Sequence, residues 1–117
     1  MSNHKISTGK KGEEIAMEYL HGKGYNILDK NYRSGHSEID LICMKRNCLI
    51  FVEVRTLNSS VYGYPEQTLS SSKISAIFRG AESYIIRNNW QGDIRFDIIA
   101  IRLYPDLELE HFQDAFY

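Results

Sequence analysis

The sequence is poor in cysteine and contains no long apolar run. Its two cysteines, Cys43 and Cys48, are too few for a disulfide-rich scaffold, and we expect reduced thiols in a cytoplasmic protein. Two thiols without further thiols nearby also make a poor zinc site. No stretch approaches the ~20 apolar residues that span a bilayer, and no apolar segment follows the basic N-terminus as it would in a secretory signal. We therefore expect a protein that does not contact membranes.

Neither sign of charge is in large excess, since the formal net charge is −1. The strongly basic composition of many nucleic-acid-binding domains is therefore absent. The acids are concentrated at one end of the chain, because four acids and one arginine follow residue 101. The part before that point consequently carries a small basic excess. This excess is compatible with a local basic surface and does not establish one.

The chain does contain a clear succession of helical and strand patterns. Its 117 residues, 43% hydrophobic and 25% charged, suit one globular domain of residues 1–117, in which we expect residues 1–7 to be flexible. Apolar residues recur at helical spacing near 8–23 and 71–88, and strand-like runs lie near 25–32, 38–44, 49–55, 94–103 and 107–112. The order α-β-β-β-α-β-β predicts an α/β domain with a mixed, hairpin-containing sheet flanked by helices.

A tight turn is predicted between the strands near 38–44 and 49–55. Asn47 tolerates a positive φ, so a two-residue turn at Arg46–Asn47 suits this hairpin. Lys45 then pairs with Cys48, and every other pair follows from this one. Because side chains alternate between the two faces, the register decides which of them lie together.

Three carboxylates and a guanidinium lie inside these otherwise apolar strands. The register places Asp40 opposite Glu53, and Glu38 opposite Arg55. All four groups then share one face with Ile42 and Phe51, while the other face takes Ile39, Leu41, Val52 and Val54. So many charges in a buried hairpin require an explanation.

The pair of Asp40 and Glu53 is costly unless a positive charge lies nearby. Two ionised carboxylates ~5 Å apart repel by roughly 3 kcal/mol at an effective dielectric of ~20. Arg55 alone can offset this repulsion, which gives a partly buried ion-pair cluster without activity. A divalent cation can also offset it, since Mg²⁺ is held by one or two carboxylates together with water and phosphate oxygens. The charge pattern by itself leaves both explanations open.

The helix near 8–23 adds one more acid. On a helical wheel Glu13 lies at the edge of the apolar arc, close to Met17 and Leu20, whereas Glu14 and Glu18 lie on the solvent side. An acid near a packed interface needs a compensating interaction. The dipole at the helix N-terminus is one such interaction, and a role in a site is the alternative.

Several motifs of the chain occur together in one known family. The strand-turn-strand segment EID…FVEVR resembles the D…(D/E)-X-K core of the PD-(D/E)XK nuclease superfamily. A narrower resemblance is to the YraN family of predicted bacterial endonucleases, itself similar to archaeal Holliday junction resolvases. It is carried by GKKGEEIAMEYLHGKGYNILDKNYR, SEIDLI, LIFVEVRT, YGYPEQTL, SSK and RFDIIAI, and covers roughly residues 9–101. The resemblance implies a restriction endonuclease-like fold and Mg²⁺ or Mn²⁺ as cofactor.

Carried over position by position, the resemblance implies a role for each matching residue. Asp40 and Glu53 would bind the metal together with the Val54 carbonyl, and Glu13 would approach the site from the first helix. Arg55 stands where the superfamily has its catalytic lysine. An arginine can stabilise charge there, but it cannot act as a base because it does not deprotonate.

Three further positions complete the implied site. Lys73, at the start of the second helix, matches a lysine of the family and is a second candidate for the catalytic cation. Glu38 matches the glutamate of the family motif GEID, although Ser37 replaces its glycine. Gln67 stands where we expect glutamate in the family. Glu38 and Gln67 are expected to support the catalytic residues rather than bind the metal.

Two functions are compatible with these residues. The first is metal-dependent hydrolysis of phosphodiesters in nucleic acid, expected to be DNA, with branched DNA as a candidate substrate and a homodimer as the matching assembly. Candidates for contacts to the nucleic acid are Arg33, His36, Lys45 and Arg46, with Tyr62 and Tyr64 for base stacking. For each of them, ordinary solvent exposure or loop packing is the simpler explanation. The second function is nucleic-acid binding without catalysis, which the arginine at position 55 favours and the three acids disfavour.

Overall fold

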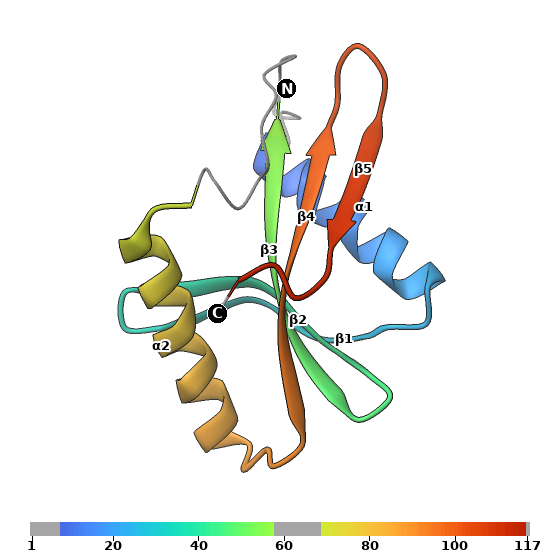
Figure 1. Ribbon diagram of the computed structural model, residues 1–117. Helices are drawn as coiled ribbons and strands as arrows, with labels where there is room; N and C mark the ends of the chain where they lie inside the picture. Colours follow the sequence, from blue (N-terminus) through green and yellow to red (C-terminus); the bar gives the residue numbers. More distant parts are fainter. Residues whose placement is uncertain (1–7, 58–68, 117) are drawn as a thin grey trace, which may run out of the picture.

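The computed structural model describes residues 8–57 and 69–116, which form two helices and five strands (Figure 1). In chain order the elements are α1 (Thr8–Gly22), β1 (Asn26–Ser34), β2 (Ser37–Lys45), β3 (Cys48–Leu57), α2 (Ser71–Arg87), β4 (Asp93–Arg102) and β5 (Glu108–Phe112). The predicted order α-β-β-β-α-β-β and the mixed α/β fold are confirmed. Residues 1–7, expected to be flexible, lie outside the described residues.

The strands form one twisted, mixed sheet in the order β1-β2-β3-β4-β5. β3 and β4 run parallel because α2 connects them as a crossover, and the other neighbouring pairs of this sheet are antiparallel. α1 covers one face of the sheet and α2 covers the other (Figure 1). β3 runs toward the end of the molecule at which both helices begin.

Each face of the sheet has its own hydrophobic core. The core under α1 contains buried residues of α1, β2, β3 and β4: Ala16, Leu20, Leu41, Ile50, Val52 and Ile99. The core under α2 contains buried residues of β2, β3, α2 and β4: Ile39, Ile42, Leu49, Phe51, Ile77, Ala81 and Phe96. Successive residues of β3 enter the two cores in turn, as expected for a strand that is covered on both faces.

The sequence predicts reduced cysteines and no membrane-spanning segment, and the structure can be compared with both predictions. Cys43 is buried and Cys48 is partly exposed, and both are free thiols. Burial raises the pKa of the Cys43 thiol to about 12, so this side chain behaves as a small apolar residue of the core. In the part of the chain that the structure describes, neither helix is long and apolar enough to cross a bilayer.

The hairpin of β2 and β3 has the predicted turn and register. Arg46 and Asn47 have φ values of 52° and 63°, which suits a two-residue turn whose central residues are both left-handed. Lys45 pairs with Cys48, and the pairing continues without a shift as far as Leu41. The turn chemistry at one asparagine therefore sets the register of both strands.

One predicted side-chain orientation in β2 is wrong. Alternation predicts Ile39 on the same face as Leu41, yet Ile39 packs in the core under α2 and Leu41 in the core under α1. Residues two apart share a face in a regular strand, so the alternation of β2 breaks at Asp40. In β1, Asn31 has a φ of 52°, and the pairing of β1 with β2 skips the pair of Asn31 and Asp40. The two strands thus share one local irregularity.

β2 separates from β3 beyond the same point. Their pairing ends at Leu41 and Val52, whereas β2 stays paired with β1 up to the connecting turn and β3 stays paired with β4 up to Leu57. The β1–β2 hairpin therefore leaves the sheet sideways while β3 and β4 continue together (Figure 1). For this reason the predicted placement of Glu38 opposite Arg55 is wrong.

A buried polar network centred on Asp97 of β4 lies on the α1 side of the sheet. The Asp97 carboxylate is fully buried and accepts two hydrogen bonds of 2.8 Å from Arg95 and one of 2.7 Å from His111. The backbone N–H of Asp114 donates a fourth bond of 2.9 Å. Burial alone would raise the pKa of Asp97, but these donors outweigh it and lower the pKa below its ordinary value. The network fastens β5 and the residues after it to β4.

Candidate functional site

Two carboxyl groups lie against each other where β2 separates from β3. Glu53 in β3 is 5% exposed, and Asp40 in β2 is partly buried. Asp40 Oδ2 accepts a hydrogen bond of 2.8 Å from the backbone N–H of Val54, and the Asp40 carboxylate accepts a second bond from the protonated Glu53 carboxyl. Asp40 and Glu53 therefore meet as predicted, although through their side chains after the backbone pairing has ended.

Burial and mutual repulsion oppose the simultaneous ionisation of both carboxyls. Burial, followed by the charge of Asp40, raises the pKa of Glu53 from its ordinary value of 4.5 to about 7. Burial also raises the pKa of Asp40, and the hydrogen bonds from Val54 and Glu53 offset this only in part. Near neutral pH the pair shares one proton, at a position where a cation would balance both charges.

Two cationic side chains approach Glu53 from different elements. Arg55 Nη1 lies 3.8 Å and Lys73 Nζ lies 3.7 Å from the same oxygen, Glu53 Oε2. Lys73 is in the first turn of α2, where its backbone N–H donates to the side chain of the N-cap residue Ser70. Both cationic side chains remain partly exposed, Arg55 at 31% and Lys73 at 44%. They can therefore contact Glu53 and a ligand beside it.

Glu13 acts on the same site from α1. It is partly buried whereas Glu14 and Glu18 are exposed, as the helical wheel predicts. Burial, followed by the charge of Asp40, raises the pKa of Glu13, while a hydrogen bond with the Asn31 side chain lowers it. Acids from α1, β2 and β3 thus influence one another electrostatically.

The acids suit a hard divalent cation that takes few protein ligands. Among residues 8–57 and 69–116, no three His, Cys, Asp or Glu side chains are grouped closely enough to hold a metal by themselves. The pair of Asp40 and Glu53 supplies two carboxylates, and Mg²⁺ is commonly held by one or two, with water and phosphate as its other ligands. The Val54 carbonyl faces the same edge of β3 as the Val54 N–H, which binds Asp40. The donor set therefore fits Mg²⁺ or Mn²⁺.

Two of the predicted nucleic-acid contacts lie near the turn between β1 and β2. Arg33 and Glu38 are partners in neighbouring strands and form an exposed ion pair of 3.7 Å. His36 is exposed in the turn. Glu38 therefore contacts Arg33 rather than supporting Arg55, and it adds only a distant charge to the site.

The other two predicted contacts lie at the opposite end of β2. Arg46 is exposed in the turn that precedes β3, and Lys45 Nζ lies 4.6 Å from the centre of the Tyr25 ring. Glu53 is five residues beyond Cys48, so the turn is about 17 Å away along β3 at ~3.3 Å per residue. The structure does not bring this pair to the acids. Three further predicted residues, Tyr62, Tyr64 and Gln67, lie outside the described residues.

Two features beside Glu13 are absent from the sequence predictions. The first is Asn31, for which the available signal was an asparagine within a strand pattern, since asparagine is favoured at positive φ. The second is a close contact between α1 and β3: a Cβ added at Gly12 would lie 2.1 Å from Thr56 Oγ1. This oxygen is buried and has no hydrogen-bond partner among the described residues. No local sequence pattern pairs two positions so far apart in the chain.

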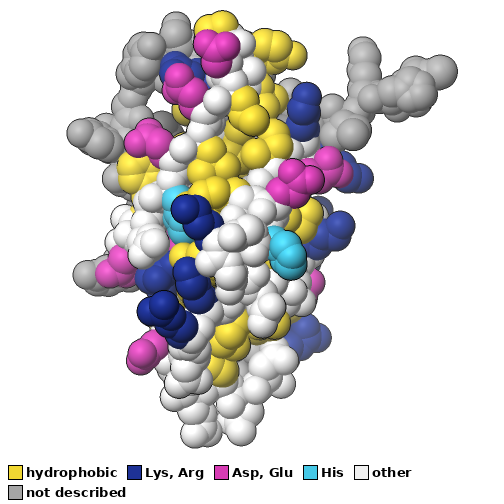
Figure 2. Space-filling view, turned by 90° about the vertical axis from the view of Figure 1, so that its right-hand side faces the viewer, with side chains coloured by type: hydrophobic (Ala, Val, Ile, Leu, Met, Phe, Trp, Pro, Cys, Tyr) yellow, Lys and Arg dark blue, Asp and Glu magenta, His cyan; other side chains and the backbone are white. Residues whose placement is uncertain are grey.

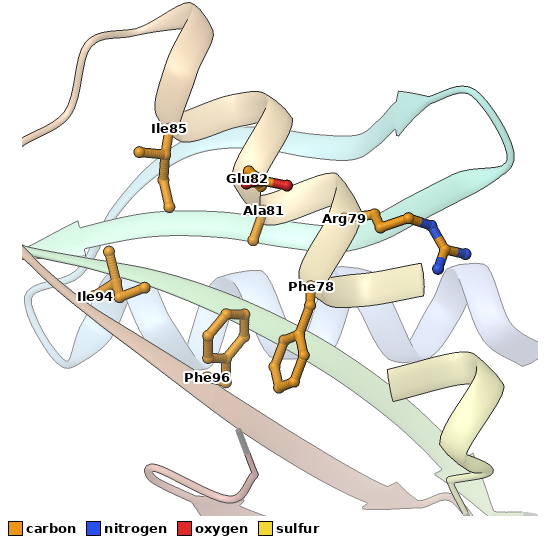
Figure 3. A pocket seen from close by; sticks show the side chains of 7 residues that line it. All are labelled: Phe78, Arg79, Ala81, Glu82, Ile85, Ile94 and Phe96. Atoms are coloured by element: carbon orange, nitrogen blue, oxygen red, sulfur yellow. The ribbon is translucent and has the colours of Figure 1, made fainter. Parts of the chain in front are cut away.

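An apolar pocket of about 440 Å³ lies between α2 and β4, apart from these acids (Figure 3). It is lined by Phe78, Arg79, Ala81, Glu82, Ile85, Ile94 and Phe96. The Arg79 guanidinium points away from the apolar side chains, as Figure 3 shows. No residue of the candidate site lines this pocket, so the two are separate features.

The face formed by α1 and β5 is not uniformly charged. Figure 2 shows basic and acidic side chains interspersed with a central group of hydrophobic side chains on this face. A surface that follows a nucleic-acid backbone is expected to have clustered basic residues. The face in Figure 2 therefore does not have the character of such a surface.

Comparison with known proteins finds a family whose sequences resemble this chain over most of its length. The model of a family described as uncharacterised protein family UPF0102 matches residues 12–101. The matched range contains all the acids and cations of the candidate site, from Glu13 to Lys73. It also nearly coincides with residues 9–101, the part of the chain that resembles the YraN family.

Three similar proteins illustrate the extent of the match. UPF0102 protein FP2501 of Flavobacterium psychrophilum is 40% identical over 118 residues, which cover 100% of this chain and 98% of that protein. A UPF0102 protein of Cytophaga hutchinsonii is 45% identical over 96 residues, covering 82% and 85%. UPF0102 protein LI0223 of Lawsonia intracellularis is 42% identical over 110 residues, covering 92% and 83%. The names of these three proteins state no activity.

Proposed function

The chain belongs to the uncharacterised protein family UPF0102, which is YraN-like, and we propose that it is a metal-dependent endonuclease acting on DNA phosphodiesters. The observation that carries this proposal is the pair of Asp40 and Glu53, a partly buried and a buried carboxyl that share one proton where a cation would balance both. The element order supports a restriction endonuclease-like classification, here proposed for a single domain of residues 1–117.

The metal of the proposal is Mg²⁺ or Mn²⁺, held by Asp40, Glu53 and the Val54 carbonyl. When bound, such a cation activates water as a nucleophile and balances charge on the phosphate. The burial of Glu53 adds a pH dependence of its own. Its carboxyl retains a proton up to about pH 7, and cation binding must displace that proton. Cation affinity therefore increases with pH as Glu53 ionises.

Lys73 and Arg55 are the cationic catalytic residues of the proposal. Each lies within hydrogen-bonding reach of a phosphate placed beside Glu53, because each is partly exposed and close to Glu53 Oε2. There they stabilise the negative charge that develops on the phosphate during hydrolysis. Arg55 cannot exchange a proton with the attacking water, whereas a lysine amine can. We assign phosphate binding to Arg55 and the role of the superfamily lysine to Lys73.

The remaining assignments concern the substrate and its partners. In this proposal Glu13 supports the metal site from α1 and Gln67 supports the acids, while Glu38 pairs with Arg33 and adds only a distant negative charge. Arg33 and His36 contact the DNA backbone beside the turn between β1 and β2, and Lys45 and Arg46 contact it farther from the acids. Branched DNA is the candidate substrate, and a homodimer matches its two-fold form. The protein would act in the cytoplasm.

A second function, nucleic-acid binding without catalysis, is favoured by one observation. Position 55 carries an arginine where the superfamily has its catalytic lysine. In that case Asp40 and Glu53 would remain a protonated pair beside Arg55 and Lys73. DNA would then bind without being cleaved.

The test is DNA cleavage across a titration of Mg²⁺ or Mn²⁺. Supercoiled, branched and single-stranded DNA are offered to the wild type and to the Asp40→Asn and Glu53→Gln variants. Glu18→Gln is the matched control, since it neutralises an exposed acid of α1. We expect cation-dependent cleavage by the wild type and the control, and about a 10³-fold loss in each site variant.

Two results would contradict the proposal in different ways. Cleavage that persists in both site variants would show that the chemistry lies elsewhere. DNA binding by a wild type that neither binds the cation nor cleaves would select the second function.

A further inference from the structure

The apolar pocket between α2 and β4 lies at the surface and is lined mainly by aromatic and aliphatic side chains. Phe78 and Ile85 line it from α2, and Ile94 and Phe96 line it from β4 (Figure 3). The centroids of the two phenylalanine rings are 4.9 Å apart, and Phe116 packs against both rings without lining the pocket. A small-molecule site needs polar groups that converge on the ligand, yet the guanidinium that borders this pocket points away from it. The pocket is therefore better suited to an apolar protein surface.

The exposed face of α2 continues from this pocket. On a helical wheel four exposed residues fall within an arc of ~60° beside the pocket residues of α2: Ser75, Arg79, Glu82 and Ile86. Ile86 is 71% exposed, which is a large exposure for an isoleucine. Among residues 8–57 and 69–116, Arg79 and Glu82 form no ion pair with each other or with a third residue. The face therefore combines apolar area with one unpaired charge of each sign.

The order of the charges on this face makes the face complementary to itself. Two copies of α2 can pack antiparallel about a two-fold axis that passes midway between Arg79 and Glu82. Arg79 of each copy then faces the partner subunit's Glu82, so two ion pairs form at once. A nucleic acid or another partner with charges of one sign would match only one of the two side chains and would repel the other. The charge pattern therefore favours a second copy of this chain as the partner.

We infer that the outer face of α2 and the adjoining pocket form the interface of a homodimer, in which two antiparallel α2 helices exchange ion pairs between Arg79 and Glu82. The inference names the surface of the homodimer that the proposed function includes, and in that respect it rests on the proposed function. Lys73 lies nine residues before Glu82, or about two and a half helical turns, so the two side chains leave α2 on opposite sides. The interface therefore leaves Lys73 and the pair of Asp40 and Glu53 uncovered.

The test is the dissociation constant of the dimer, measured for the full chain by analytical ultracentrifugation in EDTA without DNA. Arg79→Glu gives each copy two acids on this face, and Glu82→Arg gives each copy two cations. Each variant alone is expected to dimerise about a hundredfold more weakly, because both contacts across the two-fold axis become repulsive. An equimolar mixture of the two variants should return to within about tenfold of the wild type, because each contact again joins opposite charges. Only contacts between copies can be restored by mixing.

Two matched controls make the same changes of charge on α1. Lys11→Glu and Glu14→Arg alter exposed residues and should leave the dissociation constant unchanged, while circular dichroism checks that every variant keeps its fold. A wild type that stays monomeric up to ~1 mM, variants of α2 that dimerise like the wild type, or a mixture that regains nothing would each overturn the inference. None of these measurements involves a cation or cleavage. Loss of the dimer would therefore leave the metal site open to its own test, and failure of cleavage would leave this interface standing.

Discussion

Replacing Asp40 with asparagine is expected to stabilise the metal-free protein and to abolish its response to Mg²⁺. The asparagine oxygen can still accept the bond from the Val54 N–H, which Asp40 accepts at 2.8 Å. Its amide can donate to the Glu53 carboxylate, so no buried polar group loses its partner. What disappears is the negative charge that opposes the ionisation of Glu53. Because most substitutions destabilise, a gain here would be informative.

The magnitude follows from the pKa of Glu53. A folded-state pKa raised from 4.5 to about 7 corresponds to roughly 3 kcal/mol, at about 1.4 kcal/mol per pKa unit. The raised pKa means that stability present below pH 4.5 is lost as the pH increases through about 7. Burial is the larger cause and the charge of Asp40 the second, so we assign roughly 1–2 kcal/mol to Asp40. In a domain of this size the melting temperature should increase by about 5 °C or more.

The assay is thermal unfolding of the wild type and Asp40→Asn at pH 8 and pH 4, in EDTA and in Mg²⁺. At pH 8 in EDTA the variant should melt at the higher temperature, and at pH 4 the difference should shrink because Glu53 is protonated in both proteins. Mg²⁺ should raise the melting temperature of the wild type alone. A variant that is less stable than the wild type at pH 8 in EDTA would refute the repulsion. An unchanged response to Mg²⁺ would refute Asp40 as a ligand.

Three further predictions concern other parts of the chain. Hydrogen bonds lower the pKa of Asp97, so the stability that they supply is present above its ordinary pKa of 3.8 and is lost as the pH falls through the folded-state pKa. Urea unfolding measured across an acid titration should therefore show a shallower loss of stability in Asp97→Asn. At pH 7 this substitution should cost about 3 kcal/mol of stability. Gly12→Ala should destabilise the protein by roughly 1–3 kcal/mol in the same assay because the added Cβ would clash with Thr56. Combined with Gly12→Ala, Thr56→Ala should restore most of the lost stability, whereas Thr56→Ser should not because it retains the oxygen. If the proposed chemistry holds, Lys73→Ala should lower kcat about 10²-fold with little change in KM, while Arg55→Lys should retain cleavage; a larger loss in Arg55→Lys than in Lys73→Ala would reverse the two assignments.

The turn of the β2–β3 hairpin shows what local sequence can determine. Asparagine at position 47 readily adopts a left-handed backbone conformation, and the two-residue turn that this allows fixes the pairing of Lys45 with Cys48. The meeting of Asp40 with Glu53 follows from that register. These inferences succeeded because each depends on residues that are near one another in the chain.

The departures arise where distant segments decide the outcome. Ile39 packs under α2 because the alternation of β2 breaks at Asp40, and that break is matched by the left-handed Asn31 in β1. A prediction made from the residues of β2 alone assumes regular alternation, because it contains no information about an irregularity in the neighbouring strand β1. The proximity of Lys73 to Glu53 likewise depends on how α2 packs, which the spacing of residues in the sequence does not specify.

The hairpin that joins Asp40 to Glu53 also bears on the order of events during folding. β-Hairpins form within microseconds, whereas parallel strands such as β3 and β4 must first close a long loop, here the one that contains α2. The two acids are therefore expected to meet before α2 delivers Lys73. Until then the folding chain lacks one of the two cations that balance Glu53, and the acids oppose the hairpin that joins them. A site suited to a divalent cation would thus slow the folding of the chain that forms it, and a cation available during folding would remove part of that barrier.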